Sequence, residues 1–228
     1  MRRPTAALAV AVISVLITGC VSNVGNAESV TTTRTMIPRP LVERELVKLL
    51  LHPEQVNVAM GTVGMTVTNT QTSMSDNSAT MAPAECLAVD GAAEAPVYAA
   101  SGFRAERDQS LNNGDDFTHY LKQAVVLFPT VEMARTFLDA SAQQWPACSE
   151  YIHTQSGSQW SVGRISVAGD TLRTIATQQD AGAPGWACGR ALALRNNVII
   201  DINTCSANPG DSAVRIADQI AANVSAQW

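Results

Sequence analysis

The stretch WACGRALALRNNVIIDINTC, residues Trp186 to Cys205, decides the fold of this chain. Two largely apolar segments flank the pair Asn196-Asn197, and a cysteine stands near each end. A metal loop, a redox pair or a disulfide-linked hairpin would each place two cysteines in such a stretch. Asparagine tolerates the positive φ that a type I′ turn demands, so the two asparagines predict the two-residue loop of a β-hairpin.

This loop fixes which residues of the hairpin face each other. Arg195 and Val198 close the loop, and seven residues further out Cys188 faces Cys205. The closing pair is hydrogen-bonded and pair types alternate along the ladder, so an odd step makes the cysteines a non-hydrogen-bonded pair. Cα atoms of such a pair lie about 4.5 Å apart, within the range that a disulfide accepts. We therefore predict a Cys188–Cys205 disulfide.

The spacing of cysteines and histidines argues against the other two interpretations. The sequence has no C-x2-C pair, and its histidines, His52, His119 and His153, are not at metal-ligand spacing. A catalytic dithiol is usually C-x-x-C. We expect neither a metal ion nor any other cofactor.

The first residues predict export and a lipid anchor. Two arginines precede an uncharged apolar run, residues 4–19, which is shorter than the roughly 20 residues of a membrane-spanning helix. The sequence ITGC, ending at Cys20, resembles the bacterial lipobox, whose cysteine receives a diacylglyceryl group before cleavage on its amino side. We divide the chain into a lipoprotein signal peptide (1–19), a flexible tether from lipidated Cys20 (20–38) and one globular domain (39–228).

Charge and anchor together limit the partners. Without Arg2 and Arg3 the chain has 13 basic against 20 acidic residues, a net charge of −7. Binding to nucleic acid rests on clustered Lys and Arg, so we expect no nucleic-acid partner. Acyl chains bury methylenes at about 0.8 kcal/mol each, so two or three chains at Cys20 suffice to hold the protein on the extracytoplasmic face of the cell membrane.

An exported protein is expected to pair its remaining cysteines. With Cys20 assigned to the lipid, four cysteines are left. Cys188–Cys205 takes two of them, and by elimination the second disulfide is Cys86–Cys148.

The spacing of apolar residues changes along the domain and predicts an α+β fold. Helical spacing and caps predict helices at residues 41–50, 53–61, 131–145 with Thr130 as N-cap, and 211–226. Turn clusters and alternation predict strands at residues 103–111, 117–128, 159–167, 171–178, 187–195 and 198–204. Helices before and after a run of hairpins imply an antiparallel sheet of hairpins covered by helices on at least one face.

The face of the hairpin that carries the cystine is the candidate ligand surface. On this face Arg190 lies diagonal to Asp201, either as an ordinary cross-strand ion pair or as a polar wall of a cleft. Arg104 and His119, near the neighbouring hairpin, complete the candidate ligand-binding residues. The opposite face is small and apolar and is expected to meet the helices, through Ala191, Ala193, Ile200 and Ile202.

Acidic residues beside His119 could suggest an enzyme. Asp115, Asp116 and His119 lie within five residues, but a turn cluster beside a strand usually gives neither the reach nor the shifted pKa of acid–base catalysis. No G-x-S-x-G, S-x-x-K or H-E-x-x-H motif is present. We predict a solvated hairpin loop and a protein that is not an enzyme.

Several segments resemble one family, the PknH-like extracellular (sensor) domain: LLLHPEQVNVAMGTVGMTV, APAECLAV, AVVLFPTVEMARTFLDASAQQWPAC, WACGRALALRNNVIIDINTC and AVRIADQIAANV. This family includes the outer domain of a mycobacterial receptor serine/threonine kinase and many stand-alone lipoproteins. The resemblance covers about residues 37–228, including the order and spacing of the four cysteines. It implies an α+β fold, two intrachain disulfides paired as above, and a solvent-open cleft for an unidentified ligand. Neither a kinase domain nor a transmembrane helix is expected in this chain.

These observations predict a membrane-anchored extracytoplasmic lipoprotein that acts as a ligand-binding or sensory module. A small molecule, a lipid or a glycan of the cell envelope is the candidate ligand. The alternative is a structural or interaction lipoprotein without a small ligand, and a hydrolase ranks last.

Overall fold

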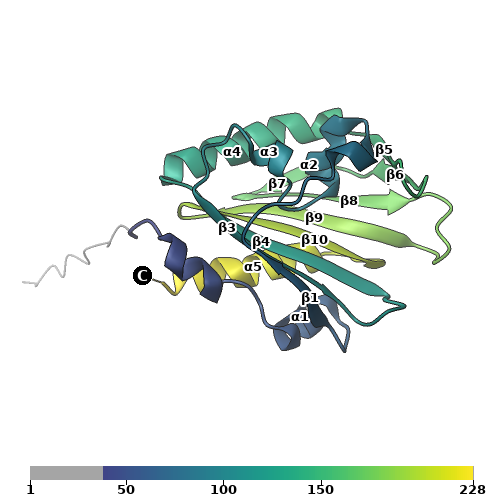
Figure 1. Cartoon of the computed structure of the whole chain (residues 1–228), viewed down its shortest axis with the longest axis horizontal. Helices are drawn as coiled ribbons and strands as arrows, with labels where there is room; N and C mark the ends of the chain where they lie inside the picture. Colours follow the sequence, from purple (N-terminus) through teal and green to yellow (C-terminus); the bar gives the residue numbers. More distant parts are fainter. Residues whose placement is uncertain (1–37, 228) are drawn as a thin grey trace, which may run out of the picture. The chain divides into compact units, whose positions relative to one another are not determined.

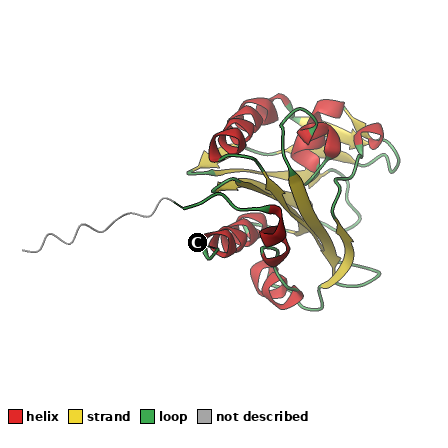
Figure 2. Ribbon diagram, turned by 60° about the vertical axis from the view of Figure 1, so that its left-hand side comes forward, coloured by secondary structure: helices red, strands yellow, loops and turns green. Residues whose placement is uncertain are grey.

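The structure is a computed structural model that describes residues 38–227. The predicted signal peptide, Cys20 and nearly all of the predicted tether lie outside these described residues. Within residues 38–227, ten strands form one sheet whose strands pair antiparallel, with helices on both faces (Figures 1 and 2). The predicted α+β class is confirmed.

From edge to edge, the order of neighbouring strands in the sheet is β1-β3-β4-β10-β9-β8-β6-β5-β2, and β7 pairs with β8. The strands are β1 (Thr66–Gln71), β2 (Met81–Ala82), β3 (Ala105–Asn112), β4 (His119–Leu127), β5 (Glu150–His153), β6 (Gln159–Val162), β7 (Ser166–Ala168), β8 (Thr171–Gln178), β9 (Trp186–Arg195) and β10 (Val198–Ala207). The α-helices are α1 (Pro53–Met60), α2 (Leu87–Asp90), α3 (Ala95–Tyr98), α4 (Val131–Gln144) and α5 (Ser212–Ser225), and the 3-10 helices are η1 (Glu43–Lys48), η2 (Ser78–Thr80), η3 (Ala84–Cys86) and η4 (Trp145–Ala147).

The central hairpin, β9 and β10, has the predicted register. Arg195 faces Val198, and Cys188 faces Cys205 at a Cα–Cα distance of 4.1 Å, joined by a disulfide. The second predicted disulfide also forms and joins the end of η3 to the residue after η4, Cys86–Cys148. Both pairings are confirmed.

The hairpin loop differs from the expected type I′ turn. Of its two residues only Asn196 has a positive φ, 54°, whereas a type I′ turn needs two. Asn197 is instead buried and fixed by its side chain. Its Nδ2 donates to the carbonyl oxygens of Leu41 (3.1 Å) and Phe128 (2.7 Å), and its Oδ1 accepts from the Leu41 N–H (2.7 Å). The loop thereby ties the start of the domain to the end of β4.

Helices cover both faces of the sheet and enclose two apolar clusters. On one face, α1, α5 and η1 pack on the small apolar side of the hairpin, as predicted. On the other face, α2, α3 and α4 pack on Leu192, Leu194 and Ile199 beside the Cys188–Cys205 disulfide. Figure 1 shows these two groups of helices above and below the sheet.

The predicted strand 159–167 is divided into β6 and β7. Both pair with β8, but the register changes by one residue between Val162↔Ala176 and Ser166↔Arg173. A Cβ atom on Gly163 would stand 2.8 Å from the carbonyl oxygen of Ile175, so glycine permits the close backbone approach at this bulge.

Other predicted elements need smaller corrections. The helix expected at residues 41–50 is the shorter 3-10 helix η1, whereas α1, α4 and α5 lie as predicted. Thr130 caps α4, because its Oγ1 accepts from the N–H of Met133 at 3.2 Å. The edge strand β1 was not predicted, because the sequence TVTNTQ is exposed along nearly its whole length and has no buried alternation. None of the helices in the described residues is long and apolar enough to cross a bilayer.

Candidate functional site

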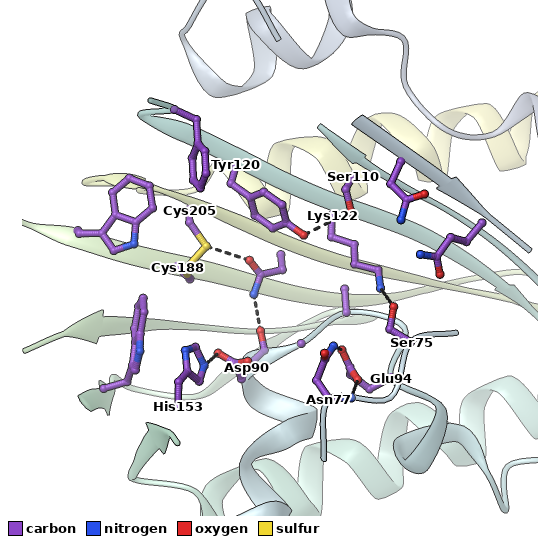
Figure 3. A pocket seen from close by; sticks show the side chains of 18 residues that line it. Ser75, Asn77, Asp90, Glu94, Ser110, Tyr120, Lys122, His153, Cys188 and Cys205 are labelled. Atoms are coloured by element: carbon purple, nitrogen blue, oxygen red, sulfur yellow. Dashed lines mark hydrogen bonds and ion pairs between the residues drawn. A yellow bond between two sulfur atoms is a disulfide. The ribbon is translucent and has the colours of Figure 1, made fainter. Parts of the chain in front are cut away.

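A cleft of about 380 Å³ lies where one end of the sheet meets the segment around α2 (Figure 3). One wall is the sheet, with Asn69, Gln71, Ser110, Tyr120, Lys122, Trp186, Cys188, Asn203 and Cys205. Facing them are the segment 75–94 and the strands β5 and β6, with Ser75, Asn77, Asp90, Gly91, Ala92, Glu94, His153 and Trp160. Phe117, from the turn between β3 and β4, completes the lining.

The cystine of the central hairpin forms part of the cleft. Asn203, two residues before Cys205 and on the same face of β10, donates from Nδ2 to the backbone oxygen of Asp90. Its Oδ1 lies 3.1 Å from the Sγ of Cys205, a sulfur–oxygen contact because a cystine sulfur has no hydrogen to donate. Asn203 therefore joins the sheet to the opposite wall beside the disulfide.

Asp90 and His153 form an ion pair across 63 residues of sequence. The Nε2 of His153 lies 3.0 Å from Oδ1 of Asp90, and both side chains are half-buried. The hydrogen bond to Asp90 raises the pKa of His153. This pair fixes α2 against β5 and brings a proton-exchanging group to the cleft (Figure 3).

Glu94 is a buried carboxylate held by one residue. Its oxygens accept from the backbone N–H of Asn77 (2.9 Å) and from the Asn77 Nδ2 (2.7 Å). Only 2% of Glu94 is exposed, and this burial raises its pKa. These two hydrogen bonds hold the loop at residues 75–77 against the start of α3.

Lys122 connects the two walls. From β4 its Nζ donates to the Oγ of Ser75 at 3.2 Å (Figure 3). The same Nζ lies 3.8 Å from Oδ2 of the buried Asp108. Asp108 therefore balances the charge of this lysine from within the protein.

Aromatic rings are concentrated in the cleft. Phe117 lies 6.2 Å from both Tyr120 and Trp186, measured between ring centroids. Trp160 stacks on Tyr151 at 5.9 Å and lies 5.6 Å from His153. Phe117 is 42% exposed, which is unusual for a large apolar side chain and leaves its ring accessible.

The predicted pair Arg190 and Asp201 forms, but inside the protein. Nη1 of Arg190 lies 2.7 Å from Oδ1 of Asp201, each side chain is 2% exposed, and neither residue lines this cleft. Arg190 also donates to the backbone oxygens of Ala88 and Val89, each at 3.0 Å. The Tyr98 hydroxyl and the Ala93 N–H donate to Oδ2 of Asp201, each at 2.9 Å. The pair thus fastens the α2–α3 segment to the sheet.

The other two predicted ligand residues also lie away from the lining of this cleft. Arg104 is exposed just before β3. His119 is half-buried at the start of β4, with its Nδ1 3.3 Å from Oγ1 of Thr62, and burial lowers its pKa. The turn predicted to be solvated does expose Asp115 and Asp116, while its Phe117 reaches the cleft.

Sequence reasoning missed most of the cleft. Asp90, Glu94 and His153 come from short elements, or from the residue before one, that have no clear apolar period and were not predicted. The one usable signal was the cystine face of the hairpin, which supplies Cys188, Asn203 and Cys205. In the described residues no group of three or more His, Cys, Asp or Glu side chains is arranged to hold a metal ion.

The two disulfides that join parts of this helix-covered sheet are typical of a domain that folds outside the cytoplasm. The family model of the PknH-like extracellular domain matches residues 41–223. The chain belongs to this family, which confirms the resemblance seen in its sequence.

Known relatives agree with this assignment. Serine/threonine-protein kinase PknH of Mycobacterium tuberculosis (strain H37Rv) is 33% identical over 222 residues, covering 95% of this chain and 35% of the kinase. PknH of Mycobacterium bovis is 34% identical over 188 residues, covering 80% and 31%. The crystal structure of the extracellular domain of PknH from M. tuberculosis matches with a TM-score of 0.77 and 32% identity, covering 82% of this chain and 98% of that one. This chain spans about a third of the length of the kinases.

Proposed function

We propose that this protein is an extracytoplasmic ligand-binding or sensory module, held on the membrane by lipid at Cys20, with its ligand site in the cleft described above. The observation that carries the proposal is the cleft itself, in which polar groups converge among aromatic rings. Such a combination is typical of ligand sites. The relatives support an extracytoplasmic position, because the matched structure is an extracellular domain.

The bonding of the cleft residues favours binding over catalysis. Asp90 is bound to His153, Glu94 to Asn77, and Lys122 to Ser75 beside Asp108. These acidic and basic groups are therefore engaged with other side chains of the protein. An acid–base catalyst needs such groups directed at the substrate.

Native mass spectrometry of the protein purified from its own cell envelope tests the ligand proposal. We expect a retained small molecule that disappears in Ser110→Trp, because the indole would fill the cleft beside Tyr120. Thr177→Trp is the matched control, since Thr177 is exposed on β8 and does not line the cleft. A cleft that is empty in every preparation would refute ligand binding and favour a structural envelope protein.

The anchor has a separate test. We expect the mature protein to begin at Cys20 and to carry a diacylglyceryl group there by mass spectrometry, whereas Cys20→Ala should lack the lipid and keep residues 1–19, because lipidation precedes cleavage. A mature protein without a lipid mass on Cys20 would overturn the anchor.

A further inference from the structure

We propose that the cleft binds a neutral or amino sugar, as a short saccharide or as the end of a longer glycan. This inference rests on the proposed function, because it names the ligand class of the same site. Three properties of the lining carry it: the aromatic group, the side-chain amides and the balance of charge.

The aromatic group fits the apolar face of a sugar ring. A pyranose presents C–H groups on its faces and hydroxyls around its rim, and the electron-rich face of an aromatic ring attracts such C–H groups. Trp186 and Tyr120 are half-buried and Phe117 is 42% exposed, so part of each remains accessible. The three side chains are neighbours, with Phe117 between the other two.

The amides fit the rim of the sugar. A sugar hydroxyl both donates and accepts a hydrogen bond, and so does a carboxamide. Asn69 and Gln71 reach the cleft from the edge strand β1. Asn77 and Asn203 also line it, and each keeps one N–H of its amide besides the one that it donates to Glu94 or to the Asp90 backbone. A cleft built for an acyl chain would have apolar residues at these four positions.

The charges disfavour an anionic ligand. Among the described residues that line the cleft, Lys122 and His153 are the basic ones, and each lies beside a carboxylate, Asp108 and Asp90 respectively. Glu94 adds a further acidic group. A phosphate or an anionic lipid headgroup binds best to cationic side chains that have no carboxylate partner within the protein. A neutral sugar needs none, and an amino sugar gains from the acidic groups.

The size of the cleft agrees with a saccharide. Its volume of about 380 Å³ is near the lower end of the range of about 300–1,000 Å³ for ligand pockets. This space suits a small compact ligand better than a complete lipid with its acyl chains.

The test uses residues 20–228 with Cys20→Ala, which lack the apolar run at residues 4–19 and are expected to be soluble. It is applied to an array of immobilised neutral, amino, uronic and phosphorylated glycans, and to vesicles of phosphatidylglycerol. The best soluble glycan is then titrated by NMR while the indole N–H signals of Trp145, Trp160 and Trp186 are followed. We expect saturable shifts at Trp160 and Trp186 with a neutral or amino glycan and no shift at Trp145, which is buried outside the cleft.

Variants separate stacking from simple loss of structure. Trp186→Ala is expected to weaken binding about tenfold, whereas Trp186→Phe keeps a stacking ring and stays within about threefold of the parent. Val167→Ala, at an exposed position on β7, should bind like the parent. Melting temperatures show that each variant is folded.

The two proposals fail differently. Binding of only phosphorylated glycans or phosphatidylglycerol, with shifts at Trp160 and Trp186, overturns the sugar assignment and supports the cleft as a ligand site. If no glycan binds, the sugar assignment is also overturned. The mass of any co-purified molecule then decides separately whether the cleft has a ligand.

Discussion

Glu106 makes the stability of this domain depend on pH in an unusual direction. It lies on β3 with 2% of its surface exposed, and neither of its carboxylate oxygens has a hydrogen-bond partner in the described residues. Burial, and next the nearby Asp108, raise its pKa from 4.5 to about 7. The folded protein therefore holds a proton on Glu106 that the unfolded chain loses near pH 4.5.

The sign of the effect follows from proton binding. Between pH 4.5 and 7 the folded state binds more protons at Glu106 than the unfolded state does, so its contribution to stability falls as pH rises. The two pKa values differ by about 2.5, and one pKa unit corresponds to about 1.36 kcal/mol, so the loss is about 3 kcal/mol. Glutamine is neutral at every pH and nearly the same shape. Glu106→Gln should be about 2–3 kcal/mol more stable than the parent at pH 8 and within about 1 kcal/mol of it at pH 5.

Urea unfolding at pH 5, 6, 7 and 8, with the disulfides intact, measures this difference. Subtracting the two curves isolates Glu106 from other groups, including His153. Glu54→Gln, an exposed substitution on α1, serves as control and should leave the curve unchanged. Equal pH dependence in parent and Glu106→Gln, or a parent that gains stability relative to the variant from pH 5 to 8, would refute the reasoning.

Three further outcomes are expected. Asp90→Asn should return the pKa of His153 toward 6.5, as followed by NMR of its imidazole, because the hydrogen bond to Asp90 is the main cause of the raised pKa. The stability from this pair is complete below about pH 6.5 and is lost as pH rises through the raised pKa. An unchanged titration of His153 in the variant would contradict the pairing. Arg190→Met should cost about 3–5 kcal/mol in urea unfolding because it leaves Asp201 buried without its cation, and a loss below about 1 kcal/mol would argue against the buried pair. Replacing both cysteines of Cys86–Cys148, 62 residues apart, should cost about 4 kcal/mol, against about 3 kcal/mol for Cys188–Cys205, 17 apart; the reverse order in urea unfolding would contradict the loop-length argument.

The parts of the fold that could be predicted are those set by local rules. The register from Arg195 and Val198 to Cys188 and Cys205 needs only a two-residue loop and the alternation of a ladder. The α4 cap at Thr130 is equally local. The turn type was wrong because Asn197 is bound by Leu41 and Phe128, residues far away in the chain.

The cleft could not be predicted from such local rules of the sequence. Asp90 meets His153 because β2 pairs with β5 and the Cys86–Cys148 disulfide links η3 to the residue after η4, contacts that bring together two segments far apart in the sequence. The Arg190–Asp201 contact was visible in the strand register. Its burial depends on Tyr98 and the backbone of α2, which no periodicity placed over the sheet.

The junction at the hairpin loop has a mechanical consequence. Asn196 donates to the backbone oxygen of Arg39 and Asn197 holds Leu41, so the polypeptide enters the domain at the loop end of the hairpin. The cystine and the cleft lie toward the other end of the ten-residue strand β9, where Cys188 is seven residues from Arg195, or about 23 Å at the rise of a β-strand. A pull applied at this entry point would act on the loop end of the central hairpin, whereas the cleft lies toward the other end. The sheet thus separates the cleft from the point where the chain enters the domain.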